Sequence, residues 1–252
     1  MKLRSFFYEE RAKTTYLLIS ICMGVFLLEL YYQLFFGKEV LNEILYSLGF
    51  SGFNFFQGNI WTFFTSIFLH ANPQHLILNM IALFFFGKVV EEELGWKKFL
   101  LIFFASSILG DIAILFSIFM GWMPFTIPTI GASAAIFGLM GAAMLVKPLE
   151  FVFYPYLIPI PLIIVAFLYI LYNIAAFFII LTTGAISNIS YVSHIGGLAM
   201  GIFFGFKEVG KTRSLIILLF ILGLLIAVPF IWFLFDYLDI LNYITRITGM
   251  FK

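Results

Sequence analysis

Long uninterrupted apolar runs are the feature that most constrains this chain. Seven of them follow one another in 252 residues, at about 15–36, 73–94, 98–120, 131–146, 156–180, 188–206 and 213–237. Most of them reach the roughly 20 residues that a helix needs to cross the hydrocarbon core of a bilayer. Because the apolar residues are continuous and do not alternate with polar ones, they favour helices over the strands of a membrane barrel. The sequence predicts an all-α polytopic membrane protein.

Composition excludes several other classes of protein. Hydrophobic residues make up 63% of the chain and charged residues 11%, against about 25% charged residues in a soluble domain. The net charge of +1 offers no basic field to a nucleic acid. A single cysteine, Cys22, excludes a disulfide framework and a metal cluster held by cysteines. We therefore expect a lipid bilayer as the surroundings, and no nucleic acid, metal or cofactor.

The distribution of basic residues predicts the orientation in the membrane. If the N-terminus is inside, eleven of the fourteen Lys and Arg residues fall in inner segments, as the positive-inside rule requires. No organelle signal is visible, so we expect a multi-pass protein of the cell membrane, with its N-terminus in the cytoplasm and its C-terminus outside. Residues 1–14 form the cytoplasmic segment, 15–207 a six-span core, and 208–252 a seventh transmembrane helix with a short tail. Within the core, 37–71 is expected to be a long outer interfacial loop.

Local signals delimit the second span. Asn72 followed by Pro73 is typical of a helix start, and Gly95 of a helix end. The acidic run 91–93, followed by Lys97 and Lys98, is interpreted as a solvated inner helix end.

Four polar side chains fall at a similar outer depth although they come from three spans. His75 and Asn79 are four residues apart in the second span, Ser133 begins the fourth, and His194 lies near the start of the sixth. Polar groups inside a membrane are costly, and their presence indicates function. This conjunction predicts a site that opens toward the outer face.

The fourth span is short enough to place Ser133 below the membrane surface. Its sixteen residues cover about 24 Å, against a hydrocarbon core of about 30 Å. A helix start at that depth leaves N–H groups without partners, which suits a developing oxyanion. Ser133 lies there among small residues, after Gly131.

A glycine stripe on the sixth span allows a close neighbour. Gly197, Gly201 and Gly205 follow His194 at intervals of three, seven and eleven residues, on the same helix face. Such a stripe lets another helix approach closely, and a short serine side chain needs that approach to reach a histidine. Phe137, one turn after Ser133, could pack against the His194 ring.

Each of these residues also has an ordinary structural explanation. A glycine stripe often serves helix packing alone, and a serine near a helix start often bonds to its own backbone. Asp111 and Glu29 both fall in the outer half of the membrane. An Asp near a His raises the alternative of a Ser-His-Asp triad, which stays open because helix faces cannot be matched from sequence. No role is assigned to His70.

Three motifs in chain order make the sequence resemble the rhomboid family of intramembrane serine proteases. They are Phe68-Leu69-His70 with His75 and Asn79, Gly131-Ala132-Ser133 with Phe137-Gly138, and Ser193-His194 with Gly197 and Gly201. The resemblance covers about residues 55–207 and implies a six-helix rhomboid-like bundle, to which the seventh span is an addition.

The resemblance also implies roles for these residues. Ser133 would be the nucleophile and His194 the general base, without a required acid. Asn79, His75 and the Ser133 backbone N–H would stabilise the oxyanion, with Phe137 under the histidine. Gly131, Gly197 and Gly201 would support the site. The loop 37–71 and residues 181–187 would shape it, and the fifth span would border the path of the substrate.

Two positions depart from the family pattern. Ala134 stands where the family usually has Gly, and its methyl group could crowd the oxyanion site or tilt Ser133. Thr62, after Trp61, stands where the family often has Arg, which leaves the role of the loop open.

The main hypothesis is an intramembrane serine endopeptidase that cuts transmembrane proteins near their outer face. The alternative is a catalytically weak or inactive rhomboid-like protein that binds membrane-protein clients. A transporter is less favoured, because it would show paired repeats or broken helices at mid-membrane.

Overall fold

Apolar helices dominate the computed structural model, which describes residues 12–152, 159–183 and 190–249, without the side chains of 152, 236 and 238–249. Five helical stretches are long and apolar enough to cross a membrane: Lys13–Phe36, Pro73–Leu94, Trp96–Phe119, Leu162–Thr183 and Lys211–Phe235. Ser133–Val146 is apolar but shorter. The protein is thus a multi-pass helical membrane protein, whereas seven crossings and the orientation of the termini remain predictions.

The first compact unit ends at Gly210. Its long helices are α1 (Lys13–Phe36), α7 (Trp96–Phe119), α8 (Ser133–Val146), α9 (Leu162–Thr183) and α10 (Tyr191–Val209). The second predicted span is α5 (Pro73–Ala82), a π-helical turn η3 (Leu83–Gly87) and α6 (Lys88–Leu94) in succession. The short elements are α2 (Lys38–Leu48), α3 (Gly52–Phe56), α4 (Thr62–Thr65), η2 (Ser66–Phe68), and the paired strands β1 (Phe151–Val152) and β2 (Ile160–Pro161).

The second unit is the helix α11 (Lys211–Gly249). Its candidate membrane span, Lys211–Phe235, agrees with the predicted span 213–237, and the helix continues beyond it to Gly249. The sequence after 237 holds no proline, and its first glycine is Gly249, so no residue there interrupts the helix. Pro229 lies within the helix.

Two sequence predictions need correction. The fifth span does not extend back to Tyr156: residues 156–158 lie outside the described part, and α9 begins at Leu162, after the strand that contains Pro161. Proline disfavours a helical residue before it, which explains the later start. The segment 37–71 is not simply a loop, because α2 forms in it. Apolar residues in α2 recur at helical spacing, with Lys38, Glu39 and Glu43 between them.

Helix α8 is the centre of the first unit. Every residue from Ala134 to Leu145 is buried, and α5, α6, α7, α9 and α10 all contact α8. Its small residues make this possible, because Ala and Gly let neighbouring backbones come close on several sides. A helix surrounded in this way need not reach the lipid along its length.

Glycines bring α10 against α8 backbone to backbone. A Cβ atom added at Gly197 would overlap the carbonyl of Ala134, and one added at Gly201 would overlap the carbonyl of Gly138. The stripe predicted from the sequence thus faces α8. On the neighbouring side, Gly196 packs against α7, where an added Cβ would lie 2.8 Å from the carbonyl oxygen of Leu109.

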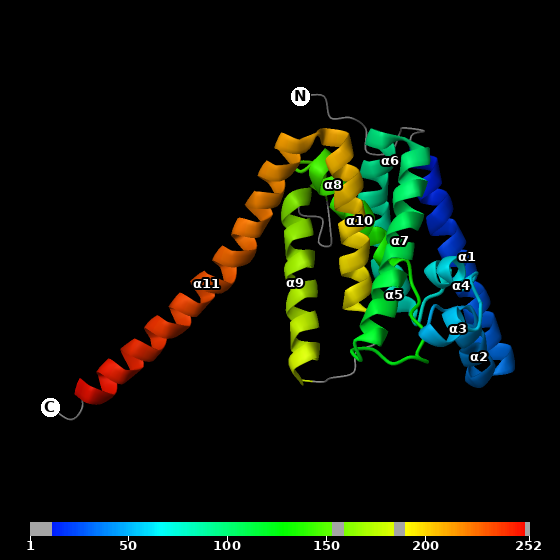
Figure 1. Cartoon of the computed structure of the whole chain (residues 1–252), viewed down its shortest axis with the longest axis horizontal. Helices are drawn as coiled ribbons and strands as arrows, with labels where there is room; N and C mark the ends of the chain where they lie inside the picture. Colours follow the sequence, from blue (N-terminus) through cyan, green and yellow to red (C-terminus); the bar gives the residue numbers. More distant parts are fainter. Residues whose placement is uncertain (1–11, 153–158, 184–189, 250–252) are drawn as a thin grey trace. The chain divides into compact units, whose positions relative to one another are not determined.

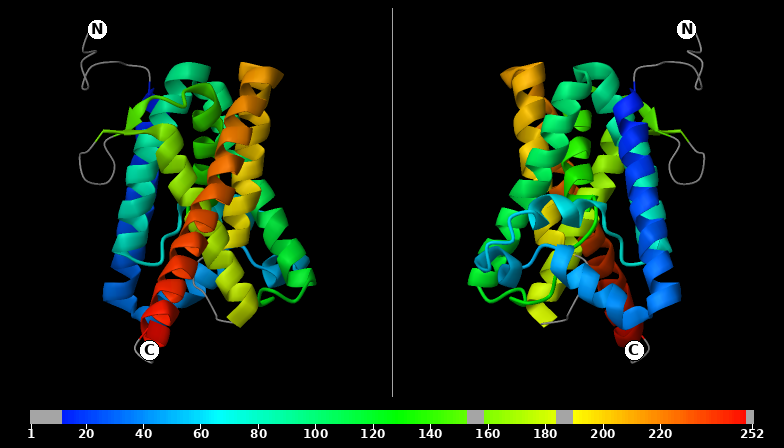
Figure 2. Two further views of the ribbon diagram at one scale, coloured as in Figure 1. Left: turned by 90° about the vertical axis from the view of Figure 1, so that its left-hand side faces the viewer. Right: turned by 90° about the vertical axis from the view of Figure 1, so that its right-hand side faces the viewer.

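The short helices stabilise the irregular segment that precedes α8. Phe50 and Thr129 exchange backbone hydrogen bonds of 3.0 and 2.7 Å, and the Gly131 N–H donates to the Ser66 carbonyl at 2.8 Å. Asn54 connects these short helices: its side-chain NH₂ donates to the carbonyls of Tyr46 and Gly49. Helices α2 and α3 lie at the opposite end of the helical unit from α6 (Figures 1 and 2).

Helix α9 is only partly embedded in the unit. Its buried residues all fall between Leu162 and Asn173, and no residue from Ile174 to Thr183 is buried. At its start, the N–H groups of Leu162 and Ile163 donate to the carbonyls of Glu150 and Pro148.

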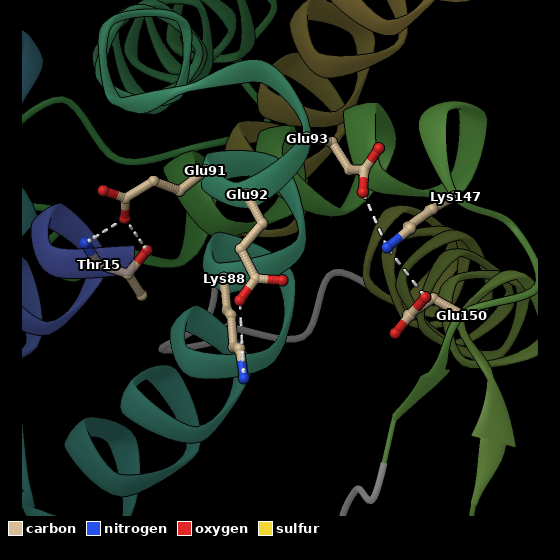
Figure 3. A network of polar contacts seen from close by, with 7 residues as sticks. All are labelled: Thr15, Lys88, Glu91, Glu92, Glu93, Lys147 and Glu150. Atoms are coloured by element: carbon tan, nitrogen blue, oxygen red, sulfur yellow. Dashed lines mark hydrogen bonds and ion pairs between the residues drawn. The ribbon is translucent and has the colours of Figure 1, made fainter. Parts of the chain in front are cut away.

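Polar contacts join the helices at the α6 end (Figure 3). The Glu91 carboxyl group accepts hydrogen bonds from the backbone N–H groups of Thr14 and Thr15 and from the Thr15 hydroxyl, at 2.7–2.9 Å. Glu91 is buried, so the interpretation of 91–93 as a wholly solvated end is wrong for this residue. Ala12 precedes α1, and its methyl side chain cannot accept a hydrogen bond from the helix. Glu91, from α6, therefore caps the N-terminus of α1 instead.

We expect Glu91→Ala to lower the free energy of unfolding by about 2–3 kcal/mol, because it leaves buried donors without an acceptor. Thermal denaturation in detergent measures this change. Glu92→Ala is the matched control, since its contact with Lys88 is a partly exposed pair at 3.7 Å, of a kind that contributes less than about 0.5 kcal/mol. Equal effects of the two substitutions would contradict this assignment.

The α8–α10 contact gives a second stability prediction. Gly201→Ala should destabilise the protein by about 1–3 kcal/mol, because the added methyl group forces two backbones apart. Gly24→Ala in α1 should not, since a Cβ atom there meets nothing within 4 Å. Thermal denaturation of both variants under the same conditions checks the comparison, and a Gly201→Ala variant as stable as wild type would refute it.

Candidate active site

Ser133 and His194 meet where α8 and α10 begin. His194 Nε2 lies 2.8 Å from Ser133 Oγ, within hydrogen-bond distance. His194 is 8% exposed, whereas Ser133 is half-buried. The two side chains come from positions 61 residues apart, and the close packing of Gly197 on Ala134 brings their helices near enough for the bond. A hydroxyl beside a neutral imidazole can be activated as a nucleophile.

Aromatic side chains fix the plane of the His194 ring. Phe137 stacks on it with 4.3 Å between ring centroids and 8° between planes. Tyr191, one turn before His194, meets the ring edge-on at 6.1 Å and 85°. The contact expected between Phe137 and His194 is therefore present.

The second ring nitrogen of His194 is bonded to α9. His194 Nδ1 lies 2.8 Å from Asn173 Oδ1, and Asn173 Nδ2 donates to the Tyr191 carbonyl at 3.0 Å. Sequence reasoning did not single out Asn173, although a lone amide in a strongly apolar span was a usable signal. The carboxyl group of Asp111 does not take this position; it is buried in α7, and Asp111 Oδ2 has no hydrogen-bond partner among the described residues.

His75 and Asn79 lie beside the backbone that leads to Ser133. A Cβ atom at Gly131 would lie 2.6 Å from Cε1 of His75 and 3.4 Å from Nδ2 of Asn79. Gly131 has φ of +115°, which favours glycine. Both the space and the backbone conformation therefore require Gly at this position.

Hydrogen-bond donors lie beside Gly131, two residues before Ser133. Asn79 is buried, and its Nδ2 has no hydrogen-bond partner within the described part of the chain. Ala132 stands at the N-cap of α8 and provides no side-chain cap, so the first N–H groups of α8 also have no side-chain acceptor there. Asn79 Nδ2 and the start of α8 thus both lie close to the backbone at Gly131.

The methyl group of Ala134 points toward α7. It lies 2.9 Å from the position that a Cβ of Gly110 would take. The glycine at 110 thus makes room for the alanine at 134, on a side of α8 that faces α7.

Glu29 and His70 hold the segment before α5. The Glu29 carboxyl group accepts a hydrogen bond from the His70 N–H at 3.1 Å, and His70 Nδ1 donates to the Phe68 carbonyl at 3.1 Å. Burial, with His75 5.2 Å away between ring centroids, lowers the pKa of His70 to about 4. His70 is therefore neutral near pH 7, and its ring lies next to that of His75.

The loop and the segment 181–187 complete the list of predicted site residues. Thr62 is buried and bonds to the Asn59 carbonyl at 2.7 Å, so the loop is anchored locally without an arginine. Residues 184–187 lie outside the described residues. Among those described, no three His, Cys, Asp or Glu side chains form a candidate metal site.

Comparison with known proteins supports the resemblance. A family model for the Rhomboid domain matches residues 57–211. The rhomboid protease GluP of Bacillus subtilis is 33% identical over 211 residues, which cover 82% of this chain and 37% of GluP. The putative rhomboid protease YdcA of the same species is 31% identical over 138 residues, which cover 54% of this chain and 67% of YdcA. The matched region thus spans little more than a third of GluP and about two thirds of YdcA.

One similar protein carries a different description. The inactive RHOMBOID-like protein 8 of Arabidopsis thaliana is 37% identical over 86 residues, which cover 34% of this chain and 22% of that protein. The family model matches more than half of the chain, and the similarity to GluP extends over most of it. The chain belongs to the rhomboid family.

Proposed function

We propose that the protein is an intramembrane serine endopeptidase that acts on transmembrane protein substrates. The observation that carries the proposal is the 2.8 Å contact between Ser133 Oγ and His194 Nε2, in a chain that belongs to a family with many members named as proteases. The chemistry is acyl transfer by a Ser–His pair.

Each proton in the proposed reaction passes through His194. Nε2 takes the hydroxyl proton as Ser133 Oγ attacks the scissile carbonyl carbon, and a tetrahedral intermediate forms. The resulting imidazolium then protonates the amine of the leaving segment as the C–N bond breaks. A water molecule, deprotonated by the same nitrogen, attacks the acyl-enzyme and releases the carboxylic acid product. Ser133 regains its proton in the last step.

The oxyanion is stabilised from two helices in this proposal. Asn79 Nδ2, buried and without a protein acceptor, the Ser133 N–H at the start of α8, and His75 donate to it. Donors held in place before the reaction lower the barrier most, because no reorganisation is needed when charge develops.

In this proposal, cleavage occurs near the outer membrane face, and the substrates are themselves transmembrane segments. The bias of basic residues supports this placement, as does the short α8, whose 14 residues rise only about 21 Å. A helical peptide bond is shielded, so substrates with helix-weakening residues near the cut should be preferred.

An inactive, client-binding protein is the competing function. The relative described as inactive supports it. The hydrogen-bonded Ser133–His194 pair and the accommodation of Ala134 beside Gly110 favour the protease.

Ser133→Ala and His194→Ala should each abolish cleavage of a single-span substrate in proteoliposomes, because the nucleophile or the base is lost. Ser20→Ala is the matched control: within the described part of the chain, the Ser20 hydroxyl bonds to its own helix, at Tyr16 O. The activity of this variant should equal that of wild type. Cleavage that persists in the Ser133→Ala variant would exclude the proposed nucleophile. A folded wild type that cleaves no substrate in several lipids would favour client binding.

Asn79→Ala should slow cleavage by about 10- to 1,000-fold, because one oxyanion donor is removed. The lower value applies if His75 and the backbone N–H compensate in part. Steady-state rates in the same proteoliposomes measure the change. An unaltered rate would remove Asn79 from the mechanism.

A further inference from the structure

We propose that Asn173 is a positioning residue for His194: from α9, it selects the ring tautomer and ring orientation that leave Nε2 free to accept the proton of Ser133. This inference rests on the proposed function, because it assigns to a third helix a part in preparing the base. It extends the Ser–His pair to a Ser133–His194–Asn173 relay of hydrogen bonds.

The three side chains form a continuous line through the imidazole. Ser133 Oγ lies 2.8 Å from Nε2 on one side of the ring, and Asn173 Oδ1 lies 2.8 Å from Nδ1 on the other. Asn173 is 3% exposed. Both ring nitrogens are therefore committed to partners in a buried setting, where each hydrogen bond is stronger than it would be in water.

The Tyr191 carbonyl determines which end of the amide faces the ring. Asn173 Nδ2 lies 3.0 Å from this carbonyl oxygen, which can only accept a hydrogen bond, so the NH₂ group must point there. Oδ1 then faces His194 Nδ1. Since Oδ1 also only accepts, the neutral ring must carry its hydrogen on Nδ1. The hydrogen-bond network thus assigns the lone pair of His194 to Nε2, on the side of Ser133.

The aromatic contacts do not make this selection by themselves. Phe137 stacks on the face of the ring, at 8° between planes, and a ring turned by 180° about its Cβ–Cγ bond would stack equally well. That turned ring would present carbon atoms where the two nitrogens now lie. The observed ring orientation allows the bond from Nδ1 to Asn173, and the turned orientation does not. Among the described contacts of His194 on the side away from Ser133, this bond therefore distinguishes the two orientations.

A neutral amide suits this place better than a carboxylate would. A buried ion in an apolar bundle has a large desolvation cost, whereas the amide satisfies two partners without charge. In a Ser-His-Asp triad, an acid would bond to the second ring nitrogen of the histidine. Here Asn173 occupies that position, and Asp111 is not needed there.

Three substitutions separate positioning from general packing. Asn173→Leu keeps the side-chain volume and removes the acceptor. Asn173→Asp keeps an acceptor toward Nδ1, and in its neutral form its O–H can donate to the Tyr191 carbonyl. Tyr172→Phe is the matched control, because Tyr172 OH contacts Tyr191 OH at 3.4 Å between the same two helices without touching His194.

Kinetics in proteoliposomes give the first readout. Asn173→Leu should lower kcat by about 10- to 100-fold with KM within about twofold, since the base and not the substrate contact is affected. Asn173→Asp should recover most of the activity, and Tyr172→Phe should resemble wild type. An Asn173→Leu variant with wild-type kcat, or an Asn173→Asp variant no better than Asn173→Leu, would overturn the inference.

Nitrogen-15 NMR of histidine-labelled protein in detergent gives a readout that does not require activity. The chain has three histidines, and the His194 signals are those lost in His194→Ala. Wild type and Asn173→Asp should show hydrogen on Nδ1, and Asn173→Leu a mixture of tautomers or the other tautomer. An unchanged tautomer in Asn173→Leu would refute the positioning role even if no substrate were cleaved.

If Asn173→Leu does not fold, Asn173→Asp becomes the test of the inference. This variant must then retain both the hydrogen on Nδ1 of His194 and the cleavage activity. A wild type with the expected tautomer but no cleavage would count against the proposed function alone.

Discussion

The backbone contact between α8 and α10 is the constraint on which the site depends. Ser133 has a short side chain, so its hydroxyl can reach His194 only if the two helices come together with no side chains between them. Gly197 and Gly201 make that possible, because a Cβ atom at either position would overlap a carbonyl of α8. The same requirement extends to the next helix, where Gly110 leaves room for the methyl group of Ala134. The geometry of the Ser133–His194 pair is therefore set by glycine residues on the packing faces of the helices.

A second constraint concerns backbone polar groups. The segment before α8 is irregular, and irregular backbone at membrane depth is tolerated only where protein satisfies its hydrogen bonds. The region 49–66 does this at Thr129 and Gly131, through Phe50 and Ser66. Its short helices thus support the backbone that leads to the start of α8 at Ser133. The irregular region 49–66 thus supports the irregular segment that precedes α8.

Periodicity predicted those parts of the site that lie on one helix. The intervals from Ser133 to Phe137 and from His194 to Gly197 follow from helix geometry, and the structure brings these residues together. Contacts between helices far apart in the chain were not predictable. Glu91 caps α1 across 76 residues, and Asn173 meets His194 from a helix whose rotation the sequence does not reveal. The predicted start of the fifth span was wrong near Pro161, because hydropathy alone does not show where a proline prevents helical backbone.

The burial of α9 ends at Asn173, and its last ten residues are not buried. Asn173 is therefore the last buried residue of this helix, although Phe177 beyond it still meets Trp122 at 6.1 Å between ring centroids. The side-chain amide of Asn173 is bonded to the His194 ring. A displacement of α9 at Asn173 would therefore alter a hydrogen bond of the histidine ring that also bonds to Ser133.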